Sequence, residues 1–124
     1  MTMKTVLASL FCVCAMAQSN HPPVLACNMK AISSSERPRY DVLLKKLKAS
    51  VKQQRELKDG YAWELDGKGI SLPEAADWVT MERRCCPFLT LQLEAVGNDL
   101  NYWVKLTGPE GAKAFLVAEF KLDR

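Results

Sequence analysis

The sequence predicts an α+β fold in a single domain, and three observations carry that prediction. Apolar residues recur at helical spacing in three segments and alternate with polar residues in four others. The predicted elements follow one another as strand, helix, strand, helix, strand, strand, helix, which fits one mixed four-stranded sheet with helices packed on it. A chain of 124 residues without repeats or a long linker is also the size of one domain.

Residues 1–17 are predicted to be a signal peptide. Lys4 precedes an uncharged, largely apolar run that ends in Ala15-Met16-Ala17, a small-x-small pattern typical of a cleavage site. The run is too short to span a bilayer, although an uncleaved anchor is an alternative. We therefore expect an exported protein of the bacterial periplasm, in which residues 18–124 form one α/β domain without a membrane span.

Charge and cysteine count narrow the choice of partners. The net charge is +3, and removal of Lys4 with the signal peptide leaves 16 basic against 14 acidic residues, or +2. Such a mild charge does not indicate nucleic acid or an anionic membrane as partner.

Cleavage of the signal peptide would also remove Cys12 and Cys14 and leave Cys27, Cys85 and Cys86. An odd number of thiols in an oxidising compartment leaves at least one free, metal-bound or paired with another molecule.

The first half of the chain predicts two strands and a long helix. Alternation over residues 24–32 indicates a strand, one face of which carries Leu25, Cys27, Met29 and Ala31. A helix is predicted over 36–58, with Pro38 tolerated in its first turn and Gly60 ending it. A short strand at 61–65 then leads to a turn at 66–69, and a right-handed crossover is expected to join the two strands.

A second helix is predicted over residues 71–85. Ser71 and Glu74 form a capping box at its start, and Pro87 forces the chain out of the helix near Cys85. The apolar stripe of this helix is expected to consist of Leu72, Ala75, Ala76, Val79 and Cys86. Cys85 would then point about 100° away from Cys86, toward the side of Trp78 and Met81.

The rest of the chain predicts a hairpin of strands 88–95 and 100–106 around a turn at 97–99, followed by a helix over 108–122. This order of elements resembles the thioredoxin-like core, in which a proline also precedes the third strand, where Pro87 stands here. That fold carries a Cys-x-x-Cys pair at the start of its first helix, where this chain has Ser33-Ser34-Ser35. The resemblance therefore does not imply oxidoreductase activity.

The strongest indication of function is the set of three cysteines. If Cys27 faces inward from its strand, its sulfur can meet those of Cys85 and Cys86 at one edge of the sheet. Three thiolates suit a soft ion such as Cu(I), Hg(II) or another thiophilic metal or metalloid. Zinc is less favoured, because it prefers four ligands and the single histidine, His21, lies in the tail.

Three further residues are candidate accessories of this site. Met29 can add a thioether beside Cys27, and Pro87 sets the direction of Cys86. Glu82, one turn before Cys86, can accept a thiol proton or complete a ligand shell. The simpler interpretation of Glu82 is a solvated carboxylate paired with a neighbouring arginine.

Other interpretations of the cysteines stay open. Cys27 can form a structural disulfide with Cys85 or Cys86, the remaining cysteine then being a small buried hydrophobe. Thiol–disulfide exchange through the same residues is a second option, although a helix C-terminus disfavours thiolate unless Arg83 or Arg84 offsets it. A third is a disulfide-stabilised binding module with an aromatic groove, although packing explains its candidate residues more simply: Tyr61, Trp63, Tyr102 and Trp103.

An enzymatic function is not favoured. One histidine in the tail makes a Ser-His-Asp or Cys-His arrangement improbable, and no acidic pair stands out for hydrolysis. The sequence therefore favours a protein of the bacterial envelope that binds a soft metal or metalloid without catalysing a reaction.

The motif Glu82-Arg83-Arg84-Cys85-Cys86-Pro87-Phe88, together with Cys27-Asn28-Met29 and residues 106–112, resembles a group of small bacterial proteins. In that group a Cys-x-Leu strand near the start precedes a Glu-x-x-Cys-Cys-Pro-Phe motif and a hairpin. The resemblance covers residues 25–120 and implies a heavy-metal resistance context, in line with a soft-metal site. Met29 stands where leucine is usual in that group.

Overall fold

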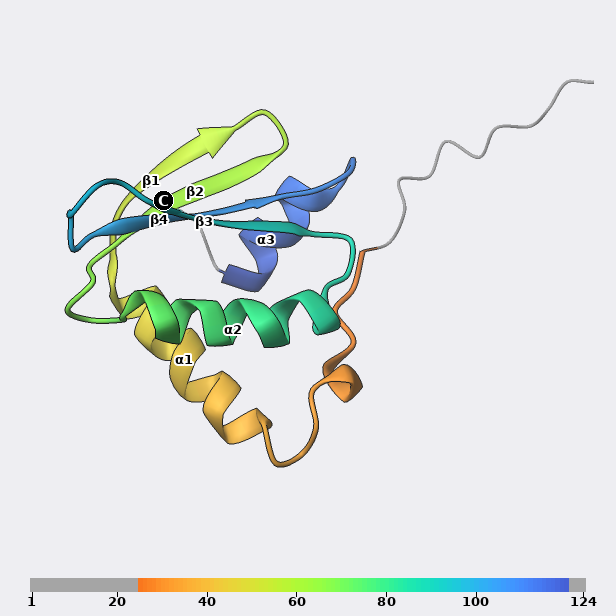
Figure 1. Ribbon diagram of the computed structural model, residues 1–124. Coiled ribbons are helices and arrows are strands. Elements are labelled where there is room, and N and C mark those ends of the chain that lie inside the picture. The colour runs from red at the N-terminus through yellow and green to blue at the C-terminus, as the bar shows by residue number, and fades with distance from the viewer. Residues whose placement is uncertain (1–24, 121–124) are drawn as a thin grey trace, which may run out of the picture.

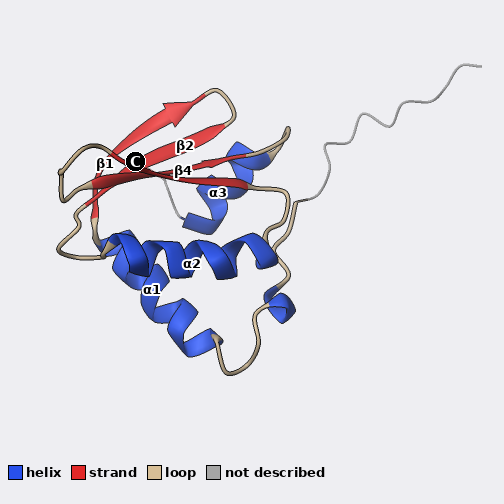
Figure 2. Ribbon diagram, in the orientation of Figure 1, coloured by secondary structure: helices blue, strands red, loops and turns tan. Residues whose placement is uncertain are grey.

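The computed structural model describes residues 25–120, and the α+β class, the single domain and the four-stranded sheet are confirmed. The helices gather on one side of the sheet (Figure 2). The elements in chain order are η1 (Met29–Ala31, a 3-10 turn), α1 (Arg37–Ala49), β1 (Val51–Leu57), β2 (Gly60–Leu65), α2 (Leu72–Cys85), β3 (Thr90–Ala95), β4 (Tyr102–Thr107) and α3 (Ala112–Phe120).

The strand predicted over residues 24–32 is wrong for the part that the structure describes. Residues 25–28 belong to no regular element, and Met29–Ala31 form the 3-10 turn η1. The side chain of Asn28 accepts a hydrogen bond from the Lys30 N–H at 3.1 Å and so starts a turn where a strand would need to continue. Ile32 is fully buried, and it fixes the end of this segment to the core.

The helix predicted over residues 36–58 is two elements. It begins as predicted, with proline in its first turn, but it ends at Ala49, and Val51–Leu57 form strand β1. The side chain of Ser50 donates to the Lys46 carbonyl at 2.6 Å, and Asp66 N–H donates to the Ser50 carbonyl at 2.8 Å. The sequence of β1 offers almost no apolar residue for a helical face, whereas as an edge strand it pairs its backbone with β2.

The sheet has the order β1-β2-β4-β3, and all three of its strand pairs are antiparallel, so the prediction of a mixed sheet is wrong. β1 and β2 are joined by a two-residue loop in place of the expected crossover, because Leu57 pairs directly with Gly60. The likeness to the thioredoxin-like core is not confirmed, since that core contains a parallel strand pair. From β2 onward the elements follow one another as the sequence predicts.

Helix α2 forms as predicted, but it is turned about its axis relative to the expected stripe. Ser71 accepts a hydrogen bond from Glu74 N–H while the Glu74 carboxylate accepts from Ser71 N–H, which completes the capping box. Leu72, which is predicted to belong to the apolar stripe, is 39% exposed. The buried residues of the helix are Ala75, Trp78, Met81, Glu82 and Cys85.

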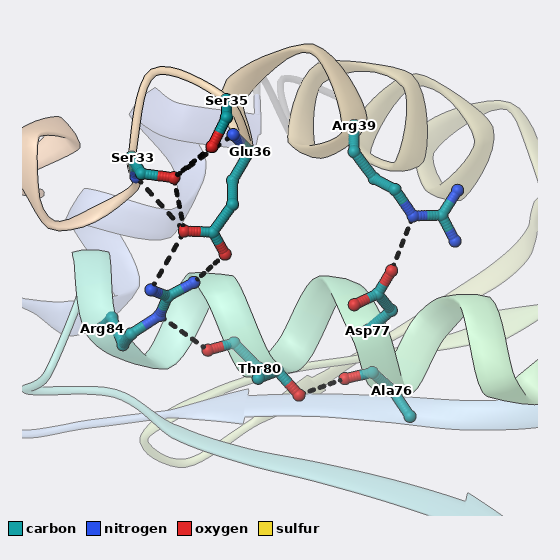
Figure 3. Close-up of polar contacts among 8 residues, drawn as sticks. All are labelled: Ser33, Ser35, Glu36, Arg39, Ala76, Asp77, Thr80 and Arg84. Atoms are coloured by element: carbon teal, nitrogen blue, oxygen red, sulfur yellow. Dashed lines mark hydrogen bonds and ion pairs between the residues drawn. The ribbon is translucent and has the colours of Figure 1, made fainter.

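Helix α2 lies against the sheet, and α1 packs on α2 (Figure 1). Two ion pairs tie the start of α1 to α2: Arg84 Nη2 lies 2.5 Å from Glu36 Oε2, and Arg39 Nε lies 2.7 Å from Asp77 Oδ2 (Figure 3). Between α2, α3 and β2, the Phe120 ring contacts the two tryptophans of the core, Trp63 and Trp78. The Arg84–Glu36 pair thus ties the C-terminal end of α2, where the vicinal cysteines lie, to the start of α1.

Two predictions lie partly or wholly outside the described residues. The signal peptide at 1–17 is among the residues that the structure does not describe, as is part of the predicted unit 18–124. Among residues 25–120, no helix is both long enough and apolar enough to cross a membrane.

Candidate functional site

The vicinal cysteines lie where α2 ends. Cys85 is the last helical residue, and Cys86 caps the helix with dihedral angles outside the helical region (φ −122°, ψ 70°), as expected because a following proline disfavours the helical conformation. The Cys86 N–H still donates to the Glu82 carbonyl at 2.8 Å. This bend turns two successive side chains to the protein interior, so that both Cys85 and Cys86 are fully buried.

The N-terminal segment brings the third cysteine to the same point. Asn28 N–H donates to the Cys85 carbonyl at 2.9 Å, which uses one of the free acceptors at the helix end. Half-buried Cys27 forms a disulfide with Cys86, with a Cα–Cα separation of 4.8 Å. Of the two disulfide partners that the sequence left open for Cys27, the structure therefore has Cys86.

Cys85 is the free cysteine of the described residues, and its thiol lies beside the disulfide. Its Sγ is 3.7 Å from the Cys86 Sγ and 3.5 Å from the Met29 Sδ. The sulfurs of Cys27, Cys85 and Cys86 all lie within 4.8 Å of one another. The three cysteines thus meet as the sequence predicts, with the thioether of Met29 beside them, and form a group that can hold a metal ion.

What this group can bind depends on its oxidation state. While the disulfide is intact, Cys27 and Cys86 have no thiolate to donate, and Cys85 alone is a thiol. Two-electron reduction would give three thiols at one point, a donor set that matches soft ions. Histidine, a common fourth ligand of zinc, does not occur among residues 25–120, since His21 lies outside the described residues.

Glu82 is a buried carboxyl group at the edge of the sulfur cluster. It is only 2% exposed, and its Oε2 accepts a hydrogen bond from the Tyr40 hydroxyl at 2.6 Å. Its Oε1 lies 3.2 Å from the Cys86 Sγ, a sulfur that carries no proton while it is disulfide-bonded. The interpretation of Glu82 as a solvated carboxylate paired with an arginine is therefore wrong.

Burial is the main cause of the pKa shifts around the sulfur cluster. It raises the pKa of Glu82, the Tyr40 hydrogen bond opposes that shift, and the charge of Glu119 adds to it. Burial also raises the pKa of the Cys85 thiol to about 11, with further contributions from Glu82 and Glu119. The pKa of Tyr40 is raised as well, by burial and by its hydrogen bond to Glu82. The Cys85 sulfur is therefore a protonated thiol at neutral pH.

The expectation that an arginine offsets the negative helix end is not met by Arg84, which pairs with Glu36. Figure 3 shows that guanidinium reaching toward the start of α1. The neighbouring Arg83 is exposed. Of the two arginines of the motif, Arg84 thus binds the start of α1 and Arg83 faces solvent. The sulfurs of Cys85 and Cys86 contact sulfur and a carboxyl oxygen.

The aromatic residues weighed as a groove serve mainly as packing. Trp63 and Tyr102 are buried in the core, and the Tyr102 hydroxyl donates to the Ile70 carbonyl at 2.9 Å. Trp103 lies on the other face of the sheet, with the Arg55 guanidinium 4.6 Å above its ring. The third accessory candidate, Pro87, is exposed and follows a trans peptide bond, as do all described residues.

Sequence reasoning missed Tyr40 as part of the site. Tyr40 lies on helix α1, and nothing local in the sequence connects it with Glu82, 42 residues away. A usable signal was present in α2 itself, because Ala75, Trp78, Glu82 and Cys85 recur at helical spacing. A carboxylate within such a row is expected to need a buried hydrogen-bond donor.

Comparison with known proteins adds no information on the site. The function proposed below therefore depends on the residues and distances already described. No family model, no curated protein and no solved structure matches this chain.

Proposed function

We propose that the chain, once its Cys27–Cys86 disulfide is reduced, binds one soft metal or metalloid ion through the thiolates of Cys27, Cys85 and Cys86. The observation that carries this proposal is the convergence of the three sulfurs within 4.8 Å of one another. Three atoms so placed share a centre no more than about 2.8 Å from each (4.8 Å divided by √3), close to a metal–thiolate bond of ~2.3 Å. Small movements of the side chains would complete the site.

Reduction is the step that opens the site. An external dithiol can supply the two electrons: its two S–H groups become one S–S bond, and their protons pass to the Cys27 and Cys86 sulfurs. Cys27 is half-buried and is the accessible sulfur of the disulfide, whereas Cys86 is fully buried. The attacking thiolate would therefore bond to Cys27, and Cys86 would leave.

The test is ion retention by the reduced and the oxidised protein. The full chain would carry Cys12→Ser and Cys14→Ser, so that its remaining thiols are the three described here. After reduction and removal of the reductant, it is offered Cu(I), Hg(II) or arsenite, dialysed, and analysed for metal content and intact mass. We expect one ion per reduced chain, and retention by the oxidised chain weaker by ~100-fold or more, because a single thiol gives no chelation.

The control for this experiment is the same chain with all three cysteines replaced by serine. If the reduced protein retains no more of any ion than this control, the proposed function is wrong.

One observation favours a second candidate, thiol–disulfide exchange: the Cys85 thiol lies 3.7 Å from a sulfur of the disulfide. Attack of its thiolate on Cys86 would form a Cys85–Cys86 bond and release Cys27 as thiolate. The raised pKa of Cys85, about 11, leaves little thiolate for this at neutral pH. Disulfide mapping by mass spectrometry tests it: we expect Cys27–Cys86 alone, and comparable amounts of a second pairing would favour exchange.

We also propose export to the periplasm and relationship to the small bacterial proteins with the Glu-x-x-Cys-Cys-Pro-Phe motif. The support for export is Lys4 and the apolar run before Ala17, and the support for the relationship is the segment from Glu82 to Phe88. Fractionation of cells that express the full chain, followed by N-terminal sequencing, tests export. A product that keeps residues 1–17 in the cytoplasmic fraction would contradict it.

A further inference from the structure

The surroundings of the three sulfurs are apolar and, where they are charged, negative. Cys85 and Cys86 are fully buried within the core cluster. The Glu82 Oε1 atom lies 3.2 Å from the Cys86 Sγ, and the carboxyl groups of Glu82 and Glu119 add to the effect of burial in raising the pKa of the Cys85 thiol. The C-terminal end of α2, where both cysteines lie, adds the negative pole of a helix.

Two basic side chains near the N-terminal segment and the end of α2 are engaged with other groups, and Arg83 is exposed. Arg84 pairs with Glu36 at 2.5 Å, and the Arg37 guanidinium donates to the Met29 carbonyl at 3.3 Å. Within residues 25–120, the hydrogen-bond contacts of the Cys85 and Cys86 sulfurs are with sulfur and with a Glu82 carboxyl oxygen, and none is with a lysine or arginine. The protein therefore offers little to balance a negative complex at this point.

Charge balance then distinguishes between soft ions. Three thiolates carry −3, so Cu(I) would leave a complex of charge −2 and Hg(II) one of −1, whereas a trivalent ion leaves none. A net charge held away from water without a partner costs several kcal/mol. From this juxtaposition of three sulfurs, two of them on fully buried cysteines, with a buried carboxyl group, we infer that the site takes a trivalent metalloid of the As(III) or Sb(III) class. This inference rests on the proposed function and specifies its ion.

The binding reaction is balanced without any change in total charge. Arsenous acid, As(OH)₃, reacts with three thiols to form three As–S bonds and three water molecules. Each thiol proton leaves on the hydroxide that its sulfur displaces, and no electrons are transferred. Neutral thiols thus become a neutral complex, which suits a buried site better than a reaction that leaves charge behind.

One pair of sulfurs, those of Cys85 and Cys86, already has the spacing of a pyramidal three-coordinate centre, and Cys27 would complete it after reduction. With bonds of ~2.3 Å, as for zinc and thiolate, a flat three-coordinate site has sulfurs ~4 Å apart, and a pyramidal site has them closer. Cys85 Sγ and Cys86 Sγ are already 3.7 Å apart. Met29 Sδ, 3.5 Å from Cys85 Sγ, is an uncharged and polarisable neighbour that can cover such a centre.

The experiment counts the sulfurs that each ion occupies. The reduced chain with Cys12→Ser and Cys14→Ser is loaded with arsenite or with Cu(I), then alkylated, and its arsenic is examined by X-ray absorption. We expect three As–S bonds, no As–O bond and no alkylated cysteine with arsenite. With Cu(I) we expect two occupied sulfurs and one alkylated cysteine, because a third thiolate would raise the charge to −2.

The variant Cys85→Ser separates the ions further. Loss of the third sulfur is expected to weaken arsenite binding by ~100-fold or more, and Cu(I) binding by clearly less, because two thiolates remain for Cu(I). Circular dichroism and a melting curve check that the variant is folded. If it is not, the alkylation count on the unaltered site still decides the inference.

The two proposals fail in different ways. If the reduced chain retains Cu(I) or Hg(II) on all three sulfurs but holds arsenite through two or fewer, the ion class is wrong and the proposed function stands. If the reduced chain retains no ion at all, the proposed function fails, and the inference fails with it.

Discussion

Glu82 is the residue whose environment differs most from that of an ordinary acidic side chain. It is 2% exposed, its Oε2 accepts from Tyr40 at 2.6 Å, and its pKa is raised, primarily by burial. A buried carboxyl group that loses its hydrogen-bond donor bears the full cost of desolvation. Tyr40 is therefore expected to stabilise the fold through Glu82, beyond the contribution of its own ring.

The change Tyr40→Phe tests this pair. It removes one hydroxyl and leaves Glu82 without its donor, so we expect the free energy of unfolding to fall by ~1–3 kcal/mol in urea titrations. The matched control is Tyr61→Phe, at a half-buried tyrosine, where a change within ~0.5 kcal/mol is expected. Equal stability of the Tyr40→Phe variant and the unaltered chain would show that the hydrogen bond does not stabilise the fold.

At the scale of the element, charged groups near both ends of α2 connect it with the first helix. Near its start, Lys46 Nζ lies 2.5 Å from Glu74 Oε2, while Glu74 also completes the capping box. Near its end, Arg84 pairs with Glu36. The hydrogen bond from Lys46, followed by that from Ser71, lowers the pKa of Glu74 to about 2 from its ordinary 4.5.

The lowered pKa gives a prediction with a definite sign. A carboxyl whose pKa is lower in the folded state contributes stability that is complete above pH 4.5 and is lost as the pH falls toward 2. The free energy of unfolding of the unaltered chain should therefore exceed that of Glu74→Gln at pH 6, and the difference should shrink toward pH 2.5. Glu110→Gln, at an exposed carboxyl before α3, is the control. A difference that stays constant with pH would contradict the assignment.

The elements also show where local sequence patterns suffice and where they do not. The capping box at Ser71, the end of α2 at Cys85 and the last hairpin follow from adjacent residues, and the structure has them. Strand β1 depends on pairing with β2, and its sequence carries little apolar pattern to indicate that pairing. Its one local signal is Asp59-Gly60 at the turn, and Gly60 equally suits the end of a helix.

The same distinction holds for the site. Convergence of the three sulfurs was predictable, because two are adjacent and the third is the sole remaining cysteine of the predicted domain. The environment of Glu82 was not, since it depends on how α1 crosses α2 and on the rotation of α2 about its axis. Packing between elements decides both, and helical periodicity fixes a stripe only to within about one residue, or 100°.

At the scale of the whole molecule, the Cys27–Cys86 disulfide closes a loop with a sequence separation of 59 residues. In the chain-entropy model, such a cross-link stabilises the folded state by about 4 kcal/mol. Reduction should lower the free energy of unfolding by up to that amount, as measured by urea titration with and without a dithiol. The comparison with Cys85→Ser is informative, because that variant keeps the disulfide and should respond to reduction in the same way.

A bound trivalent ion should restore much of what reduction removes, because it again links Cys27 to Cys86 and adds Cys85 to the link. Stabilisation by a ligand of the folded state grows as RT ln(1 + [L]/Kd) and reaches ~2.7 kcal/mol at 100 times Kd. Ion binding to thiols of the unfolded chain would reduce that gain. We therefore expect arsenite to raise the melting temperature of the reduced protein in a concentration-dependent manner, and to leave the oxidised protein unchanged. An equal rise in both forms, or none in the reduced form, would show that the three cysteines do not hold the ion as one folded site.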